Sequence, residues 1–145
     1  MKIIDYQEKY RDDLIFMILE AKDALGRIPS ISPDLLKIEV AYLEKGDKFW
    51  IALDERDRVI GSVAYSSIPQ SSQVILHRLF VKANLKRQGI GGQLLTFAED
   101  YLREIGKTIV HVHLGQPKKD WIASYSFYPK HGYLFYDDTH LRKTL

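Results

Sequence analysis

The feature that most constrains this chain is a cluster of glycines directly after a long apolar run. The segment LFVKANLKRQGIGGQLL, residues 79–95, begins with strand-forming residues, passes through a turn and continues with helix-forming residues. The first N–H groups of a helix lack partners within it, and the aligned peptide dipoles place partial positive charge there. Glycines at positions 89, 91 and 92 keep Cβ atoms away, so an anion such as a phosphate could approach those amides closely.

Two interpretations of this glycine cluster are open. Lys86 and Arg87 add positive charge beside the amides and favour a phosphate or pyrophosphate ligand. An ATP- or GTP-binding loop is disfavoured because Gln93 follows the last glycine, and a dinucleotide-binding loop because Leu94 replaces its third glycine. The alternative is a turn whose glycines only let the helix pack tightly on the strand.

Length and composition bound the remaining possibilities. The 145 residues fit one domain, residues 1–145. Cysteine is absent, which excludes disulfides, a thiolate zinc site, an iron–sulfur cluster and a cysteine nucleophile. A net charge of +2 is too balanced to indicate a nucleic-acid or membrane-surface protein. The chain begins with charged residues and no window approaches the ~20 apolar residues of a membrane span, so we expect a cytoplasmic protein without a membrane partner.

Apolar periodicity and turn residues predict the order of the elements. Strands are expected over residues 2–6, 49–53, 59–66, 73–81, 108–114, 133–136 and 140–143. Helices are expected over residues 8–25, from the start signal Ser32-Pro33-Asp34 continuously to Gly46, from the glycine cluster to Gly106, and over residues 120–128. Helices that interrupt mostly antiparallel hairpins predict an α/β fold with a mixed sheet.

Three motifs in sequence order resemble the GNAT superfamily of acetyl-CoA-dependent N-acyltransferases. Leu79-Phe80-Val81 followed by Lys86-Arg87-Gln88-Gly89-Ile90-Gly91 resembles its central motif, a strand that leads into a glycine loop and a helix. Phe127-Tyr128-Pro129-Lys130-His131-Gly132-Tyr133 is similar to its second signature, and Val59-Ile60-Gly61-Ser62 to the hairpin before the third strand. Two positions depart from the pattern. Trp121 stands where many members have an asparagine, and Pro129 lacks an N–H, so we expect the last helix to end or kink at Tyr128.

The resemblance implies a single-domain fold in which a mixed, mostly antiparallel sheet of about seven strands splays between the fourth and fifth strands, flanked by about four helices. It implies an N-acetyltransferase that moves an acetyl group from acetyl-CoA to a primary amine of a small molecule or peptide, by direct transfer in a ternary complex and without a metal. A homodimer is compatible with it. The alternatives are a non-catalytic acetyl-CoA-binding module and an acyltransferase that acts on a nucleic-acid-linked amine, which the balanced charge disfavours.

By the same resemblance, the pyrophosphate of acetyl-CoA lies on the amides of residues 87–92, and the pantetheine arm pairs with the backbone of residues 79–81. The implied cofactor-binding residues are Leu79, Phe80, Val81, Lys86, Arg87, Gln88, Gly89, Ile90, Gly91 and Gly92.

Tyr128 and His77 are the candidate catalytic residues. Tyr128 occupies the family's tyrosine position, where a protonated phenol can donate to the departing thiolate; the alternative is a buried tyrosine that holds the last helix to the sheet. His77 can accept a proton from the amine, directly or through water, and regular alternation places it on one strand face with Leu79 and Val81. Ordered water alone is the alternative base.

The acceptor is expected on the side away from the cofactor. Its walls would be the loop 26–32, the second helix and the hairpin 50–67, with Trp121 and Tyr125 closing the pocket. His111 and His113 form an H-x-H pattern, but a metal would need a third ligand that the sequence does not place, so no metal is expected.

Overall fold

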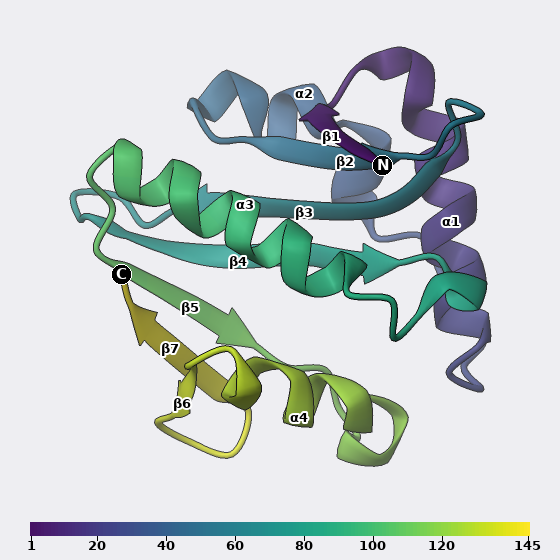
Figure 1. The fold of residues 1–145 in the computed structure, drawn as a ribbon. Helices are drawn as coiled ribbons and strands as arrows, with labels where there is room; N and C mark the ends of the chain where they lie inside the picture. Colours follow the sequence, from purple (N-terminus) through teal and green to yellow (C-terminus); the bar gives the residue numbers. More distant parts are fainter.

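A computed structural model describes all 145 residues, and a seven-stranded sheet forms its centre (Figure 1). The strands are β1 (Lys2–Asp5), β2 (Phe49–Leu53), β3 (Val59–Ser67), β4 (Gln73–Val81), β5 (Ile109–His113), β6 (Leu134–Phe135) and β7 (His140–Thr144). Their order across the sheet is β1-β2-β3-β4-β5-β7-β6. Every neighbouring pair is antiparallel except β4 and β5, which are parallel. The expected mixed, mostly antiparallel sheet is therefore confirmed.

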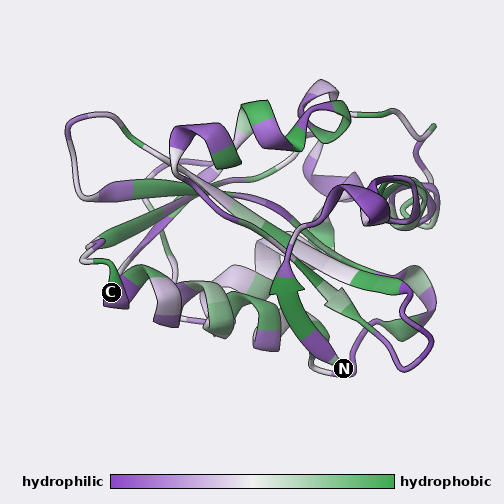
Figure 2. Cartoon of the chain, turned by 90° about the horizontal axis from the view of Figure 1, so that it is seen from above, coloured by the Kyte–Doolittle hydropathy of each residue, from purple (hydrophilic) through white to green (hydrophobic).

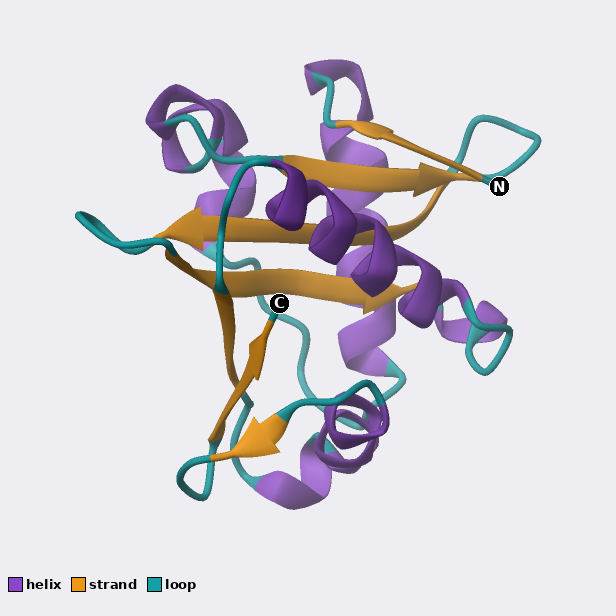
Figure 3. Ribbon diagram, turned by 60° about the vertical axis from the view of Figure 1, so that its left-hand side comes forward, coloured by secondary structure: helices purple, strands orange, loops and turns teal.

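Helices cover both faces of the sheet (Figures 2 and 3). The four α-helices are α1 (Arg11–Asp23), α2 (Ile38–Ala41), α3 (Ile90–Glu104) and α4 (Ile122–Lys130). One core of 18 buried residues joins α3 and α4 to one face, and a second core of 13 joins α1 and α2 to the other. None of these helices combines the length and the apolar character that crossing a bilayer requires.

The helices α1 and α3 follow the predicted apolar spacing. In α1, Leu14, Ile18 and Ala21 are buried, and in α3 Leu94 and Ala98 are fully enclosed. These positions recur every three or four residues, so each helix buries one stripe and leaves its other side to solvent.

The predicted second helix is wrong as a single continuous element. The segment instead forms a 3₁₀ turn (Pro33–Leu36), the short α2 and a second 3₁₀ turn (Leu43–Lys45). Lys37 (φ −142°) and Tyr42 (φ −128°) are far from helical angles, which separates the three pieces. The Ser32 side chain does not cap a helix; its Oγ lies 3.4 Å from the Lys22 ammonium.

The expectation of an end or kink at Tyr128 because of Pro129 is wrong as regards the end. The helix α4 continues through Pro129 to Lys130. A proline in the last turn loses only one backbone bond, and the end is closed from beyond it. Gly132, at φ +90°, turns the chain so that the amide of Tyr133 donates to Tyr128 O at 3.1 Å.

A bulge in the middle of β4 changes which side chains share a face. On β3, Ser62 pairs with Phe80 and Ala64 with His77, so one β3 residue faces two residues of β4. Arg78 is the inserted residue, at φ +56°, and its carbonyl accepts a hydrogen bond from Ser62 Oγ at 2.7 Å. Regular alternation fails at this point, because an extra residue shifts the following side chains to the other face.

The strands β4 and β5 separate after a short stretch of pairing. Gln73, Val74 and Ile75 are the only β4 residues paired with β5, although β4 continues to Val81. The remaining part of β4 therefore has an open edge on the β5 side. The implied splay between the fourth and fifth strands is confirmed.

Candidate active site

A pocket of about 560 Å³ lies where β4 and β5 separate. Its wall is formed by the end of β4, the glycine loop, the start of α3, the helix α4 and the last turns of α1. Nine of the ten predicted cofactor-binding residues line it, and Gln88 does not. The structure thus brings the open edge of β4 and the glycine cluster to one cavity.

The start of α3 presents unpaired amides to this pocket. Gly89 precedes the helix at φ +82°, a left-handed conformation that favours glycine. The first bond of the helix runs from Gln93 N to Gly89 O at 3.0 Å, so the amides of Ile90, Gly91 and Gly92 have no partner within the helix. A Cβ at Gly89 would meet no protein atom within 4 Å, whereas one at Gly92 would lie 3.1 Å from His131 Nε2. The glycine cluster therefore fits both interpretations: it leaves backbone amides free for an anion, and it lets the end of α4 pack closely.

Two positively charged side chains lie at the pocket and could bind an anion. Lys86 and Arg87 both line it, next to the amides of α3. Neither side chain forms an ion pair with a carboxylate. Free amides at a helix start, with two unpaired cations beside them, form a site suited to a diphosphate.

Tyr128 is buried in α4 and faces the same pocket. Its ring packs edge-on against Phe127 and Tyr133, with centroids 5.1 and 5.5 Å away. Its hydroxyl has no hydrogen-bond partner in the protein, yet it is not completely enclosed by protein atoms. Because Tyr128 lines the pocket, we infer that the hydroxyl opens toward it. Burial raises the pKa of the phenol above its ordinary value of 10, which keeps the proton in place at neutral pH. Tyr133, in contrast, donates its hydroxyl to Glu99 at 2.8 Å and serves the core.

His77 lies on the opposite face of β4 from the one expected. Leu79 and Val81 pack against the core under α3, whereas the His77 ring meets Tyr42 of the other core edge-on at 6.1 Å. The prediction that His77 shares a strand face with Leu79 and Val81 is therefore wrong, because the bulge at Arg78 interrupts the alternation. His77 Nε2 hydrogen-bonds with Ser66 Oγ at 2.8 Å. Burial, with repulsion from Arg78, lowers the pKa of the imidazole below 6.5, so it is neutral at pH 7 and can accept a proton.

The wall on the α1 side combines parts of the predicted acceptor pocket. Trp121 lines the cavity, and the guanidinium of Arg27 from the loop 26–32 lies 4.7 Å from the Trp121 ring centre. Tyr125 does not line the cavity; it donates to Gly115 O at 3.1 Å. Trp50 and Tyr65, from the hairpin, are fully buried in the core under α3. The loop thus reaches the start of α4, while the aromatic residues of the hairpin serve packing.

The two histidines of β5, His111 and His113, both contact neighbouring side chains. His111 hydrogen-bonds with Gln73 Oε1 at 2.6 Å and with the Tyr136 hydroxyl at 3.1 Å, one partner for each ring nitrogen. His113 stacks on His140 with ring centres 4.2 Å apart. No group of three or more histidine, aspartate or glutamate side chains is arranged to hold a metal ion.

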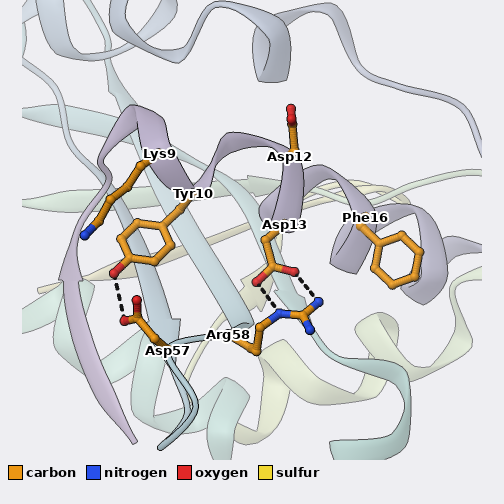
Figure 4. Close-up of a pocket in the computed structure, with 7 residues that line it drawn as sticks. All are labelled: Lys9, Tyr10, Asp12, Asp13, Phe16, Asp57 and Arg58. Carbon is orange, nitrogen blue, oxygen red and sulfur yellow. Dashed lines mark hydrogen bonds and ion pairs between the residues drawn. The ribbon is translucent and has the colours of Figure 1, made fainter.

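A second hollow, of about 540 Å³, lies at the start of α1 (Figure 4). Four of its six polar side chains are paired with one another: Tyr10 donates to Asp57 at 2.8 Å, and Arg58 forms two hydrogen bonds with Asp13 at 2.7 and 3.0 Å. Most of its charged groups are thus matched within the hollow, which makes it the weaker candidate site.

Comparison with known proteins agrees with this geometry. The model of the acetyltransferase (GNAT) family matches residues 14–133. The chain belongs to this family. The resemblance seen in the three motifs is thereby confirmed, and the GNAT fold described above accounts for the splayed sheet and the glycine loop.

Individual GNAT relatives cover different shares of the chain. A probable N-acetyltransferase 14 from Xenopus tropicalis is 35% identical over 75 residues, which is 52% of this chain and 36% of that protein. The chain thus spans about a third of that relative's length. A GNAT-family acetyltransferase from Staphylococcus aureus Mu50 superposes with a TM-score of 0.85 at 23% identity, covering 99% of this chain and 98% of that one. PaiA N-acetyltransferase from Thermoplasma acidophilum, solved in complex with coenzyme A, gives 0.80 at 20% identity, with coverage of 99% and 98%.

Two residues beside the site escaped the sequence analysis. Lys22 looks like part of an amphipathic helix, yet its ammonium is buried under the loop 26–32. Arg78 looks like an ordinary strand residue, yet it forms the bulge of β4. Neither location has a local sequence signal, because each depends on contacts between distant segments.

Proposed function

We propose that this GNAT protein transfers an acetyl group from acetyl-CoA to a primary amine of a small molecule or peptide, by direct transfer in a ternary complex. The observation that carries the proposal is the single cavity in which the unpaired amides of α3 and the unpartnered hydroxyl of Tyr128 meet. The description of the PaiA relative as a complex with coenzyme A supports the choice of cosubstrate.

The residues present fit the diphosphate and the pantetheine arm of acetyl-CoA. The amides of Ile90, Gly91 and Gly92, with Lys86 and Arg87, would hold the diphosphate. The open edge of β4 offers backbone donors and acceptors to the amides of the pantetheine arm, as an additional strand would. Bound in this way, acetyl-CoA supplies an acyl group on a sulfur that can leave.

Deprotonating the acceptor is the harder half of the reaction. An alkyl ammonium with a pKa near 10.4 is about three units from its neutral form at pH 7, which costs roughly 4–5 kcal/mol. In the proposed step the ammonium first loses one proton. The neutral nitrogen then forms a bond to the thioester carbon, the carbon–sulfur bond breaks, and the nitrogen releases its second proton to solvent. We assign the first proton to His77, directly or through a water molecule, because its lowered pKa keeps it neutral.

The departing thiolate receives a proton from Tyr128 in this proposal. A thiol with a pKa near 8.5 leaves fairly well unaided, so the acid should contribute at most the usual ~10²–10⁴-fold. Its hydroxyl is free of protein partners and burial keeps it protonated, the two properties that a general acid here needs.

A thiol-release assay with a panel of amines tests the proposal. We expect coenzyme A to appear only when both acetyl-CoA and an acceptor amine are present, with saturation in each. Tight binding of coenzyme A without release by any amine would instead favour a non-catalytic binding module. Acceptance of an RNA-linked amine alone, with a steep loss of affinity in salt, would favour the nucleic-acid alternative.

A further inference from the structure

The ammonium of Lys22 is a buried cation without a carboxylate. The residue is 9% exposed, and its Nζ donates to Ser30 O at 2.9 Å and to Ser32 Oγ at 3.4 Å. Both partners are neutral, and Lys22 takes part in no ion pair. A buried lysine is rare unless it is paired, so this charge lacks its usual compensation.

The neighbours of Lys22 add to the excess of positive charge. Arg78 is matched by Asp34, through hydrogen bonds of 2.7 and 2.9 Å. Arg27 lies over Trp121 and has no acid partner. Burial and repulsion from both arginines lower the pKa of Lys22, and Asp34 is the one acid that opposes them. Three cations therefore share one carboxylate, and two positive charges remain uncompensated.

These two charges lie behind the α1 side of the cavity wall and do not themselves line the cavity. Ala21 and Leu25, on either side of Lys22 in sequence, line the cavity, as does Trp121 beneath Arg27. The diphosphate already has Lys86 and Arg87 beside the amides of α3. An anionic group of the acceptor, which is expected on the α1 side, would balance positive charge that no protein group compensates.

We propose that Lys22 and Arg27 bind a carboxylate of the acceptor, so that the acceptor is an amino acid, that is, a small primary amine that carries a carboxylate. The inference rests on the acetyltransferase function proposed above and narrows its substrate class. The guanidinium of Arg27 offers a planar pair of donors that matches a carboxylate, and the shielded ammonium of Lys22 would gain the counter-charge that it lacks. The same charges would repel polyamines and other acceptors with several amines.

The test compares α-amino acids with their α-carboxamides as acceptors at saturating acetyl-CoA. Rates are expressed per unit of free amine, because the carboxamide has the less basic amine and is otherwise favoured. For at least one pair we expect kcat/KM for the carboxylate to exceed that for the carboxamide by about 10–100-fold, as charge-assisted hydrogen bonds predict. Carboxamides that react equally well or better in every pair, or activity confined to amines without a carboxylate, would overturn the inference.

Variants separate recognition from folding. Lys22→Met and Arg27→Gln should each lower kcat/KM for the carboxylate by a factor roughly tenfold or more larger than the loss for the carboxamide, so that the preference for the carboxylate falls. Lys45→Met, at an exposed lysine away from the cavity, should keep the preference. If the Lys22 variant loses stability in thermal unfolding, the variant at Arg27, a half-buried residue in the loop, still tests the role in recognition. Equal loss with both acceptors would assign Lys22 and Arg27 to holding the loop and overturn their role in recognition.

Failure of the underlying function gives a different result. Calorimetry that detects no binding of coenzyme A refutes the acetyltransferase proposal itself. Binding of coenzyme A with no reaction of any amino acid in the panel refutes only the acceptor class.

Discussion

Tyr128 and His77, the two residues proposed to move protons, belong to opposite faces of the sheet. Tyr128 packs in the core under α3 and α4, and His77 contacts Tyr42 in the core under α1. In the proposal His77 accepts a proton from the amine and Tyr128 gives a different proton to the sulfur. Tyr128 lines the cavity and His77 does not, although His77 lies in the part of β4 that is no longer paired with β5. Proton transfer to His77 would therefore run through water.

Replacing Tyr128 by Phe removes the proposed acid and little else, since the hydroxyl has no protein partner. We expect kcat to fall by about 10²-fold, the lower end of general acid catalysis, while the Kd of coenzyme A stays nearly constant. Tyr136→Phe, at an exposed tyrosine outside the cavity, is the matched control and should keep kcat. An unchanged kcat in the Tyr128 variant, with chemistry rate-limiting, would assign the residue to packing.

The pH profile of kcat/KM tests His77. Its lowered pKa means that it becomes protonated only below pH 6.5, so activity should be lost as pH falls through that lowered value. His77→Gln should remove this acid limb and lower the rate at neutral pH. A limb that persists in the variant would show that ordered water, rather than the imidazole, takes the proton.

At the scale of elements, the sequence predicted those helices and helix ends that depend on nearby residues. The stripe of Leu14, Ile18 and Ala21 was enough for α1, and Gly106, at φ +82°, for the end of α3. The start signal at Ser32 failed because tertiary partners compete for its side chains. Ser32 Oγ meets Lys22, and the Asp34 carboxylate meets Arg78 and Tyr42, so neither serves a helix start.

The glycine loop can be tested against a glycine of equal geometry. Gly89 and Gly106 share a φ of +82° and open space for a Cβ, so alanine at either should cost about 1–2 kcal/mol of unfolding free energy. Only Gly89→Ala places its methyl group beside the amides proposed to hold the diphosphate. Its affinity for coenzyme A should fall roughly 10–100-fold, as after the loss of charge-assisted hydrogen bonds, and that of Gly106→Ala should not. Equal affinities in calorimetry would place the anion elsewhere.

The ion pair of Asp34 and Arg78 joins the segment before α2 to the bulge of β4. Burial opposes ionisation of Asp34, but hydrogen bonds from Arg78 and Tyr42 lower the pKa of the carboxyl below its ordinary 3.8. The stabilisation is therefore present above pH 3.8 and is lost as pH falls through the lowered value. Asp34→Asn should reduce the unfolding free energy by about 1–3 kcal/mol at pH 7 and weaken this acid dependence.

The control for that variant is an ion pair on the surface. Asp100→Asn removes the exposed pair with Arg103 and should cost at most about 0.5 kcal/mol. Chemical denaturation at several pH values measures both variants. Equal losses would mean that the Asp34 pair does not hold the segment to the sheet.

At the scale of the whole molecule, sequence patterns located the strands and predicted the hairpin of β2 and β3, but they did not give the order of the strands across the sheet. The splay between β4 and β5 was implied only by the family resemblance, and their parallel pairing and its end at Ile75 were not predicted, because register depends on segments far apart in the chain. The bulge at Arg78 was not predictable from alternation, and it moved His77 to the other face. The proximity of Lys22, Arg27 and Arg78 was also not predictable, because the three residues belong to different segments that only the tertiary fold brings together.

Titration calorimetry of the folded protein with coenzyme A tests the central claim most directly. If the amides that precede Gln93 and the charges of Lys86 and Arg87 hold a diphosphate, the titration should give saturable heat with one site per chain, and affinity should weaken as salt screens the phosphates. Absence of heat and of saturation, with both coenzyme A and acetyl-CoA, would contradict the account.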